Sequence, residues 1–250
     1  MINKPIYKPK GKAKEYGDYA INIYTGCTHG CTYCYAPGVL RKSRECFAQD
    51  VRPREDIVES VKRQLERSDM KDQLIHLCFT CDPYPAGVDT TATREIIKAI
   101  KASGNHVQIL TKNGVDAMRD LTLLDENDWF GVTLSGWSYN TEKYEPHASD
   151  FNDRLHAIDI AHILGINTWV SCEPIIDQKS LLTFLKLNWY AVDKYKFGKP
   201  NYFSVGDDLA PMPWGEFGIK LEEICKKNNL NYYIKEGLRK EIEDWRENHG

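Results

Sequence analysis

Residues 22–38 read NIYTGCTHGCTYCYAPG and overlap the end of a short apolar run, YAINIY. Cys27, Cys31 and Cys34 stand within eight residues of one another, in the pattern C-x3-C-x2-C. The apolar run is brief and rich in β-branched and aromatic residues, which predicts a strand over residues 19–24. The three thiols therefore follow the end of the first strand.

The rest of the chain alternates between short apolar runs and amphipathic segments. Five further runs predict strands, over residues 74–80, 106–111, 129–135, 166–172 and 201–206. Helical spacing of apolar residues predicts helices over residues 53–70, 91–104, 115–124, 152–164, 179–187 and 214–228. Residues 231–250 add a possible seventh strand and a charged closing helix. Such alternation implies parallel strands joined by right-handed crossovers, in an α/β barrel or an open curved sheet.

Length and composition are those of one globular domain. With 250 residues, 42% hydrophobic and 28% charged, the chain can bury a single core. No apolar run approaches the roughly 18 residues of a membrane span, and the first residues lack the apolar core of a secretory signal. We therefore expect a cytoplasmic, reducing compartment, no membrane association and no disulfide framework. We divide the domain into a basic segment (1–18), a barrel core (19–206) and a C-terminal extension (207–250).

The formal net charge of −3 argues against bulk electrostatic attraction to nucleic acid. Two groups of basic residues are nonetheless clustered in the sequence. Arg41, Lys42 and Arg44 follow the cysteine cluster directly, and the N-terminal segment carries Lys4, Lys8, Lys10, Lys12 and Lys14. We interpret the N-terminal segment as a solvated tail.

Three kinds of site could explain the clustered thiols. A structural zinc site normally has four ligands in two separated pairs, and no second pair with suitable spacing is present, although His29 is nearby. A thioredoxin-like pair could use Cys31 and Cys34, but Cys27 would then be unexplained. A 4Fe–4S cluster held by three thiolates leaves one iron open to bind and activate a substrate. The residues alone leave these alternatives open.

The pattern C-x3-C-x-aromatic-C after a first strand, here CTHGCTYC, is the hallmark of the radical S-adenosylmethionine (radical SAM) superfamily. The wider string INIYTGCTHGCTYCYA resembles the spore photoproduct lyase group, and similar segments follow it: DPY (82–84), LTKNG (110–114) and residues 145–176. The resemblance implies a partial (β/α)6 barrel in which Cys27, Cys31 and Cys34 each ligate one iron of a 4Fe–4S cluster while the fourth iron binds SAM. It also implies a low-potential electron donor of the flavodoxin or ferredoxin type.

Superfamily contacts to SAM can be transferred only to positions that match its motifs. Tyr33 resembles the position whose backbone contacts the adenine amino group, Lys112 matches a lysine aimed at the SAM carboxylate, and Ser135 matches a hydroxyl that contacts the ribose. The segment after the second strand lies where the superfamily contacts the SAM amino group, and its candidates are Thr80, Cys81 and Asp82. A polar residue that caps the following helix is the simpler explanation of each position.

The remaining cysteines do not form a second cluster pattern. Spore photoproduct lyases use a cysteine near the second strand to return a hydrogen atom to a product radical, so the resemblance gives Cys78 or Cys81 that catalytic role. Because residues three apart on a strand face opposite sides, we expect these two thiols not to pair. We interpret Cys46 and Cys225 as small buried hydrophobic residues.

The leading functional hypothesis is an enzyme that reductively cleaves SAM to a 5′-deoxyadenosyl radical and abstracts hydrogen from a nucleic-acid base or nucleotide, in a lyase, repair or modification reaction. This choice of substrate rests on family analogy alone. A small metabolite or a peptide is the alternative substrate, and a non-catalytic iron–sulfur or zinc module is the alternative class of protein. Beyond the resemblance, we place near the open face Trp137, Tyr139, Tyr144, Asp207, Asp208, Trp214 and Lys235.

Overall fold

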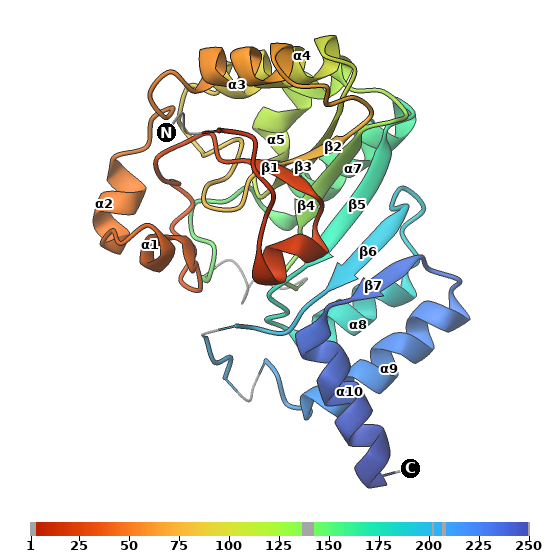
Figure 1. The fold of residues 1–250 in the computed structure, drawn as a ribbon. Helices are drawn as coiled ribbons and strands as arrows, with labels where there is room; N and C mark the ends of the chain where they lie inside the picture. Colours follow the sequence, from red (N-terminus) through yellow and green to blue (C-terminus); the bar gives the residue numbers. More distant parts are fainter. Residues whose placement is uncertain (1–3, 137–142, 202, 207–208, 250) are drawn as a thin grey trace.

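The computed structural model describes residues 4–136, 143–201, 203–206 and 209–249, which form one curved sheet with helices around it (Figure 1). The seven strands are all parallel and lie in sequence order: β1 (Tyr19–Ile21), β2 (Leu74–Leu77), β3 (His106–Thr111), β4 (Trp129–Thr133), β5 (Asn167–Cys172), β6 (Lys194–Phe197) and β7 (Tyr232–Ile234). β1 and β7 form the two edges of this sheet, so the barrel is open between them. The predicted partial α/β barrel is confirmed, and the possible seventh strand is present.

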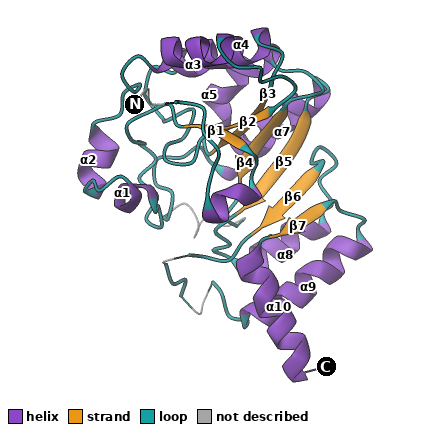
Figure 2. Ribbon diagram, in the orientation of Figure 1, coloured by secondary structure: helices purple, strands orange, loops and turns teal. Residues whose placement is uncertain are grey.

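Helices connect the strands and cover the outside of the sheet (Figure 2). They are α3 (Ile57–Glu66), α4 (Thr91–Ala102), α5 (Gly114–Ala117) with the 3-10 helix η2 (Met118–Leu123), α7 (Phe151–Ile163), α8 (Gln178–Lys186), α9 (Trp214–Lys227) and α10 (Glu236–His249). Two short helices that the sequence analysis did not predict follow the cysteine loop: α1 (Ala36–Val39) and α2 (Arg44–Gln49). Among the described residues, no helix combines the length and apolar character needed to cross a membrane.

The spacing of apolar residues explains how the first helices pack. Ile57, Val61 and Leu65 recur every four residues along α3 and are buried, and Ile96 and Ile100 do the same on α4. Residues four apart lie on one side of an α-helix, so each helix presents one apolar stripe to the core and a charged face to solvent. The strands between them are buried along nearly their whole length, as expected of a parallel sheet covered on both faces.

The sixth strand is β6, and the predicted strand over residues 201–206 is wrong. β6 reads KYKF and pairs in parallel with β5 and β7. Its two lysines hid it, because Lys194 and Lys196 break the apolar run, yet Lys196 is only 6% exposed. The described part of residues 201–206 is loop, in which the Phe203 ring packs 6.2 Å from the Tyr33 ring near the cysteine loop.

The N-terminal segment packs across the open edge between β1 and β7. It contains the 3-10 helix η1 (Gly11–Glu15), whose Glu15 carboxylate accepts a hydrogen bond from the Tyr233 hydroxyl of β7 at 3.0 Å. The next residue, Tyr16, donates its hydroxyl proton to Glu173 beyond β5. The interpretation of this segment as a solvated tail is therefore wrong, although its lysine side chains are exposed.

Candidate active site

The loop from β1 to α1 carries the three clustered cysteines at the carboxyl end of the sheet (Figure 1). The backbone N–H of Cys34 donates to the carbonyl oxygen of Cys31 at 3.1 Å. The Arg44 guanidinium donates to the carbonyl oxygens of Cys31 and Cys34 at 3.1 and 3.3 Å, and the N–H of Cys27 donates to the Phe47 carbonyl oxygen at 3.1 Å. Helix α2, which contains Arg44 and Phe47, therefore holds the shape of the loop.

Two glycines allow this loop to pack tightly. A Cβ atom on Gly26 would lie 2.0 Å from the backbone oxygen of Phe47, which is far inside contact distance. Gly30 has a φ of +66°, a backbone conformation that favours glycine, and a Cβ atom added to it would lie 3.2 Å from the His147 ring. The spacing of small residues between the cysteines thus follows from the close approach of α2 and the loop after β4.

The sulfurs of Cys27, Cys31 and Cys34 do not all lie within 4.8 Å of one another. Among the described residues, three His, Cys, Asp or Glu ligand atoms lie within 4.8 Å of one another only at His106, Asp125 and Asp128. Zn–S bonds of about 2.3 Å would place tetrahedral thiolates about 3.8 Å apart. Burial raises the pKa of Cys31 to about 12, so metal binding must displace thiol protons. A 4Fe–4S cluster, with one thiolate on each of three irons, fits this donor set.

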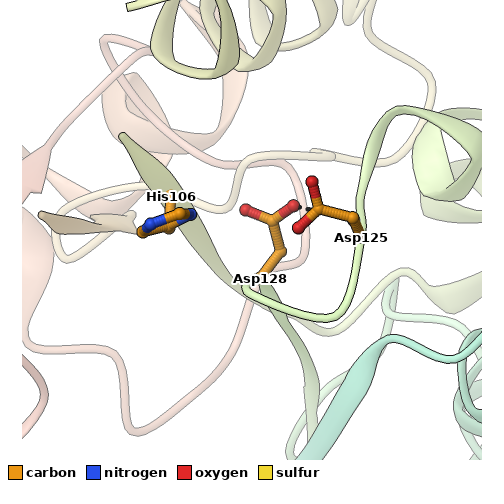
Figure 3. Close-up of side chains that lie close together, drawn as sticks. All are labelled: His106, Asp125 and Asp128. Atoms are coloured by element: carbon orange, nitrogen blue, oxygen red, sulfur yellow. Dashed lines mark hydrogen bonds between the residues drawn. The ribbon is translucent and has the colours of Figure 1, made fainter. Parts of the chain in front are cut away.

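The group of His106, Asp125 and Asp128 is a structural cluster (Figure 3). It lies where β3 begins, at the end of the sheet opposite the cysteine loop. The Lys101 ammonium contacts Asp125 at 2.7 Å and Asp128 at 2.5 Å, and the Val107 N–H donates to Asp128 at 2.7 Å. The carboxylates already have a cation and a backbone donor, so we assign them no metal.

The loops after β1, β3 and β4 bring three of the predicted SAM contacts together. The Lys112 ammonium lies 5.6 Å from the centre of the Tyr33 ring, and the Tyr33 hydroxyl lies 3.3 Å from Ser135 Oγ. The Tyr33 hydroxyl donates a hydrogen bond to the Glu145 carboxylate, and the Ser135 hydroxyl donates to the same carboxylate at 2.7 Å. Residues up to 112 positions apart in the chain therefore form one polar site beside the cysteines.

The sequence analysis missed the ion pair at the centre of this site. Arg154 Nη1 lies 2.6 Å from Glu145 Oε2, and each residue is 6% exposed. Burial raises the pKa of Glu145, but the charges of Arg154 and Lys112 and the hydroxyl donors lower it to about 2. One signal was available: Arg154 is a charged residue on the buried face of α7, where Leu155 and Ile158 are its neighbours.

Asp82 joins three of the loops that form the site. Its carboxylate accepts hydrogen bonds from the Thr111 hydroxyl at 2.6 Å, the Lys112 N–H at 2.9 Å and the Tyr84 N–H at 2.8 Å. The buried His29 Nδ1, from the cysteine loop, is 3.5 Å away. Asp82 thus fixes the ends of β2 and β3 relative to the cysteines, and any contact it makes to a cofactor would be added to these bonds.

Thr80 has a polar atom to offer a ligand. Its hydroxyl is buried and has no hydrogen-bond partner among the described residues. Its backbone N–H, like that of Phe79, donates to Asn22 Oδ1 at 2.8 Å, which fixes its position. An unsatisfied buried hydroxyl costs about 1–3 kcal/mol, so a bound group that satisfies it is stabilised by a similar amount.

Cys78 and Cys81 are both free, as expected, but not for the reason predicted, and the prediction that Cys46 is buried is wrong. β2 ends at Leu77, so Cys78 and Cys81 lie in the bend that follows it and not on opposite faces of a strand. The Cys81 sulfur accepts a hydrogen bond from the Tyr24 N–H at 3.3 Å. Cys46 is exposed, whereas Cys225 is buried as expected.

The residues expected near the open face fall into three groups. The Tyr144 ring packs 5.5 Å from Phe203, beside the cysteine loop. Trp214 opens α9, and Lys235 is buried inside the barrel with its ammonium 2.7 Å from Glu173. The others lie outside the described residues: Trp137, Tyr139, Asp207 and Asp208.

The fold is a partial α/β barrel of parallel strands, with three cysteines in the loop that follows its first strand. The chain belongs to the radical SAM superfamily, whose family model matches residues 21–175. That family implies a 4Fe–4S cluster and SAM as cofactors.

Sequence relatives come from an archaeon, a virus and a bacterium. MJ0683 of Methanocaldococcus jannaschii is 27% identical over 182 residues, 70% of this chain and 68% of the relative. ORF301 of Acidianus two-tailed virus is 27% identical over 197 residues, 70% of this chain and 64% of the relative. Rv2578c of Mycobacterium tuberculosis is 32% identical over 117 residues, 43% of this chain and only 33% of the relative. The chain thus spans about two thirds of the first two relatives.

Solved structures share the fold at low sequence identity. A spore photoproduct lyase variant with bound SAM and dinucleoside spore photoproduct superposes with a TM-score of 0.68 at 14% identity, covering 91% of this chain and 78% of that one. Methylornithine synthase superposes with a TM-score of 0.52 at 13% identity, covering 86% and 63%. At these identities the likeness establishes the fold alone.

Proposed function

We propose that the protein is a radical SAM enzyme that reductively cleaves SAM and abstracts hydrogen from a nucleic-acid base or nucleotide. The observation that carries the SAM chemistry is the convergence of Cys27, Cys31 and Cys34 with Lys112 and Ser135 at one end of the barrel. When bound, a 4Fe–4S cluster supplies a low-potential electron and SAM supplies the 5′-deoxyadenosyl radical. A ferredoxin or flavodoxin would deliver the electron in the cytoplasm.

The chain's own residues would bind and orient the cofactor. The Lys112 ammonium would meet the SAM carboxylate; burial acts to lower its pKa, but its neighbours, Glu145 among them, raise it above the ordinary value. The Thr80 hydroxyl, buried without a partner, would accept a hydrogen bond from the SAM amino group. Ser135 donates to Glu145 and keeps lone pairs that can accept a hydrogen bond from the ribose hydroxyls.

Two observations support a nucleic-acid substrate. Tyr33, Tyr144 and Phe203 form an aromatic group near the cysteine loop, with ring centres 5.5 and 6.2 Å apart, and aromatic rings stack on nucleobases of any sequence. The spore photoproduct lyase structures hold a dinucleoside photoproduct, and the motif string around the cysteines resembles that group. A stacked duplex would hide the reacting carbon, so the base must be single-stranded or extruded. Cys78 or Cys81 would return hydrogen to the product radical.

Anaerobic incubation with SAM and dithionite tests the cofactor chemistry. Protein reconstituted with iron and sulfide should release 5′-deoxyadenosine and methionine, even slowly without substrate. Cys31→Ala should release neither, because one iron loses its thiolate ligand. Tight zinc and no iron after anaerobic purification, with no SAM cleavage, would leave a non-catalytic metal module in place of the proposal.

Binding to single-stranded oligonucleotides tests the substrate class. Arg41 is the cation to change, because Arg44 and Lys42 hold the cysteine loop through backbone carbonyls. Arg41→Gln should reduce the slope of log affinity against log salt by about 0.7 if it contacts one phosphate. Lys226→Gln on α9, whose parent side chain is 66% exposed, is the matched control and should leave the slope unchanged. Absence of binding to DNA and RNA at low salt would favour a small metabolite or peptide.

A further inference from the structure

The N-terminal segment carries a run of lysines on the surface of the barrel. Residues 4–18 contain five lysines and two acidic residues, in a chain whose net charge is −3. All five lysines are exposed: Lys4, Lys8, Lys10, Lys12 and Lys14. In a solvated tail such charges would have no fixed positions. Here the backbone that carries them is part of the fold.

Two sets of hydrogen bonds fix the first part of this backbone. The Ile6 N–H donates to Gln64 Oε1 of α3, and the Ile6 carbonyl oxygen accepts from Gln64 Nε2, both at 2.9 Å. Tyr7 and Ala20 of β1 exchange backbone hydrogen bonds at 2.9 and 3.0 Å. Ordering a backbone costs about 1–2 kcal/mol per residue. Because the fold has already ordered this segment, a ligand that binds its lysines loses little further backbone entropy.

The positive charge of the segment is not neutralised by its neighbours. The Glu15 carboxylate faces the barrel, where it accepts hydrogen bonds from the Tyr233 hydroxyl and the Glu236 N–H, both at 3.0 Å. Within the described ranges, no carboxylate forms an ion pair with four of the lysines: Lys4, Lys8, Lys10 and Lys14. These four cations are therefore available to an anionic partner.

The run of lysines leads to the candidate active site. The Lys12 ammonium donates to Asn201 Oδ1 in the loop after β6. Two residues further along, the Phe203 ring packs 6.2 Å from the Tyr33 ring and 5.5 Å from the Tyr144 ring. The outer edge of β1 and the aromatic group beside the cysteine loop are thus joined by one cationic segment.

We propose that Lys4, Lys8, Lys10 and Lys14 form a track that binds the phosphates of a single-stranded nucleic acid, while the aromatic group at the site stacks on its bases. This rests on the nucleic-acid substrate proposed above and names the surface on which the strand lies. Cations along the backbone combined with aromatic rings under the bases are how proteins bind single strands without reading their sequence. Residues 4–10 span at most about 20 Å, which is long enough to reach several successive phosphates.

The salt dependence of binding tests the track. Anaerobically reconstituted holoprotein is titrated into fluorescein-labelled oligothymidylate and oligouridylate of about 20 nucleotides, and anisotropy is followed between about 50 and 200 mM salt. Changing the four track lysines together to Gln should reduce the slope of log affinity against log salt by about 2 to 3, at about 0.7 for each of three or four phosphate contacts. Changing the same four to Arg keeps the charge and should retain the parent slope.

A second set of lysines controls for total charge. Four exposed lysines on α8 and α9 are changed together to Gln, which removes the same charge from another surface: Lys179, Lys186, Lys226 and Lys227. This control should leave the slope unchanged. If the parent binds and both Gln variants lose slope equally, or neither does, the track is refuted while the nucleic-acid substrate stands. If the parent binds neither oligonucleotide at low salt, both proposals fail.

Discussion

Lys196 carries a charge inside the barrel and allows a quantitative test of the fold. Its ammonium lies 4.0 Å from the centre of the Tyr16 ring and donates to the backbone carbonyl of Glu15, and it makes no ion pair within the described residues. Burial, with repulsion from Lys194 and Lys235, lowers its pKa from 10.5 to about 7. The folded protein therefore releases a proton that the unfolded chain retains at neutral to alkaline pH.

The sign and size of the effect follow from this difference in proton binding. Between pH values of about 7 and 10.5 the unfolded state binds more protons, so the free energy of unfolding should rise with pH by up to about 1.4 kcal/mol per pH unit. Because half of the Lys196 side chains are already neutral near pH 7, the gain from pH 7 to 9 should be about 2 kcal/mol. Lys196→Met keeps the apolar stem and removes the charge, so it should lose this gain.

Urea unfolding of the two proteins at pH 7, 8 and 9, at constant ionic strength, measures the effect. Lys196→Met should be more stable than the parent at pH 7, and the difference should shrink by about 2 kcal/mol by pH 9. Lys226→Met on α9, whose parent side chain is 66% exposed, is the control, because Lys226 is exposed and plays no part in the Lys196 shift. A difference that stays constant over this range, or that grows with pH, would refute a buried lysine of depressed pKa.

The remaining predictions concern the site. Cys27→Ala should abolish the visible charge-transfer absorption and lower the iron content of anaerobically reconstituted protein; a full complement of iron would exclude Cys27 as a ligand. Lys112→Ala should weaken SAM binding by about 1.5–3 kcal/mol, roughly 10- to 150-fold, in equilibrium dialysis, whereas Lys98→Ala on the exposed face of α4 should not. Unchanged affinity would make Lys112 structural. Gly26→Ala should lower the free energy of unfolding by about 1–3 kcal/mol and reduce iron incorporation, because its Cβ would lie 2.0 Å from the Phe47 oxygen. Gly38→Ala, which meets no atom within 4 Å, should do neither.

Local signals allowed the sequence to predict the barrel and the cysteine loop. The strands that were predicted correctly are apolar along their length, since helices cover one face and the barrel interior the other. The sequence analysis missed β6 because Lys196 interrupts its apolar pattern. In the fold the Lys196 ammonium lies inside the barrel against the rings of Tyr16 and Tyr233, which are far away in the chain. The aromatic character of residues 201–206 resembled that of a strand. In the fold the Phe203 ring of this segment instead packs against the Tyr33 ring beside the cysteine loop.

Tertiary pairing explains the other failures. The sequence shows Glu145 and Arg154 as ordinary charged residues, and only the fold makes them a buried pair at 2.6 Å. The end of β2 at Leu77 removes the argument used for Cys78 and Cys81, because alternation of side chains holds only while the strand continues. Lys112, Ser135 and Tyr33 could be predicted to lie together because each is close to the end of a strand or beside a cysteine, and their contacts with SAM remain predictions.

Helix η1 ties the first residues of the chain to the last strand. Glu15 accepts its hydrogen bond from Tyr233, which is separated from it by 218 positions in sequence, and its backbone carbonyl accepts a hydrogen bond from Lys196. During synthesis η1 leaves the ribosome long before its partners on β6 and β7 do. The contact between Tyr7 and Ala20 can form early and cover the edge of β1, whereas the contacts of Glu15 must wait for almost the whole chain. The barrel therefore closes last at the edge where its sequence begins, and a nascent chain stalled before β7 holds an open sheet.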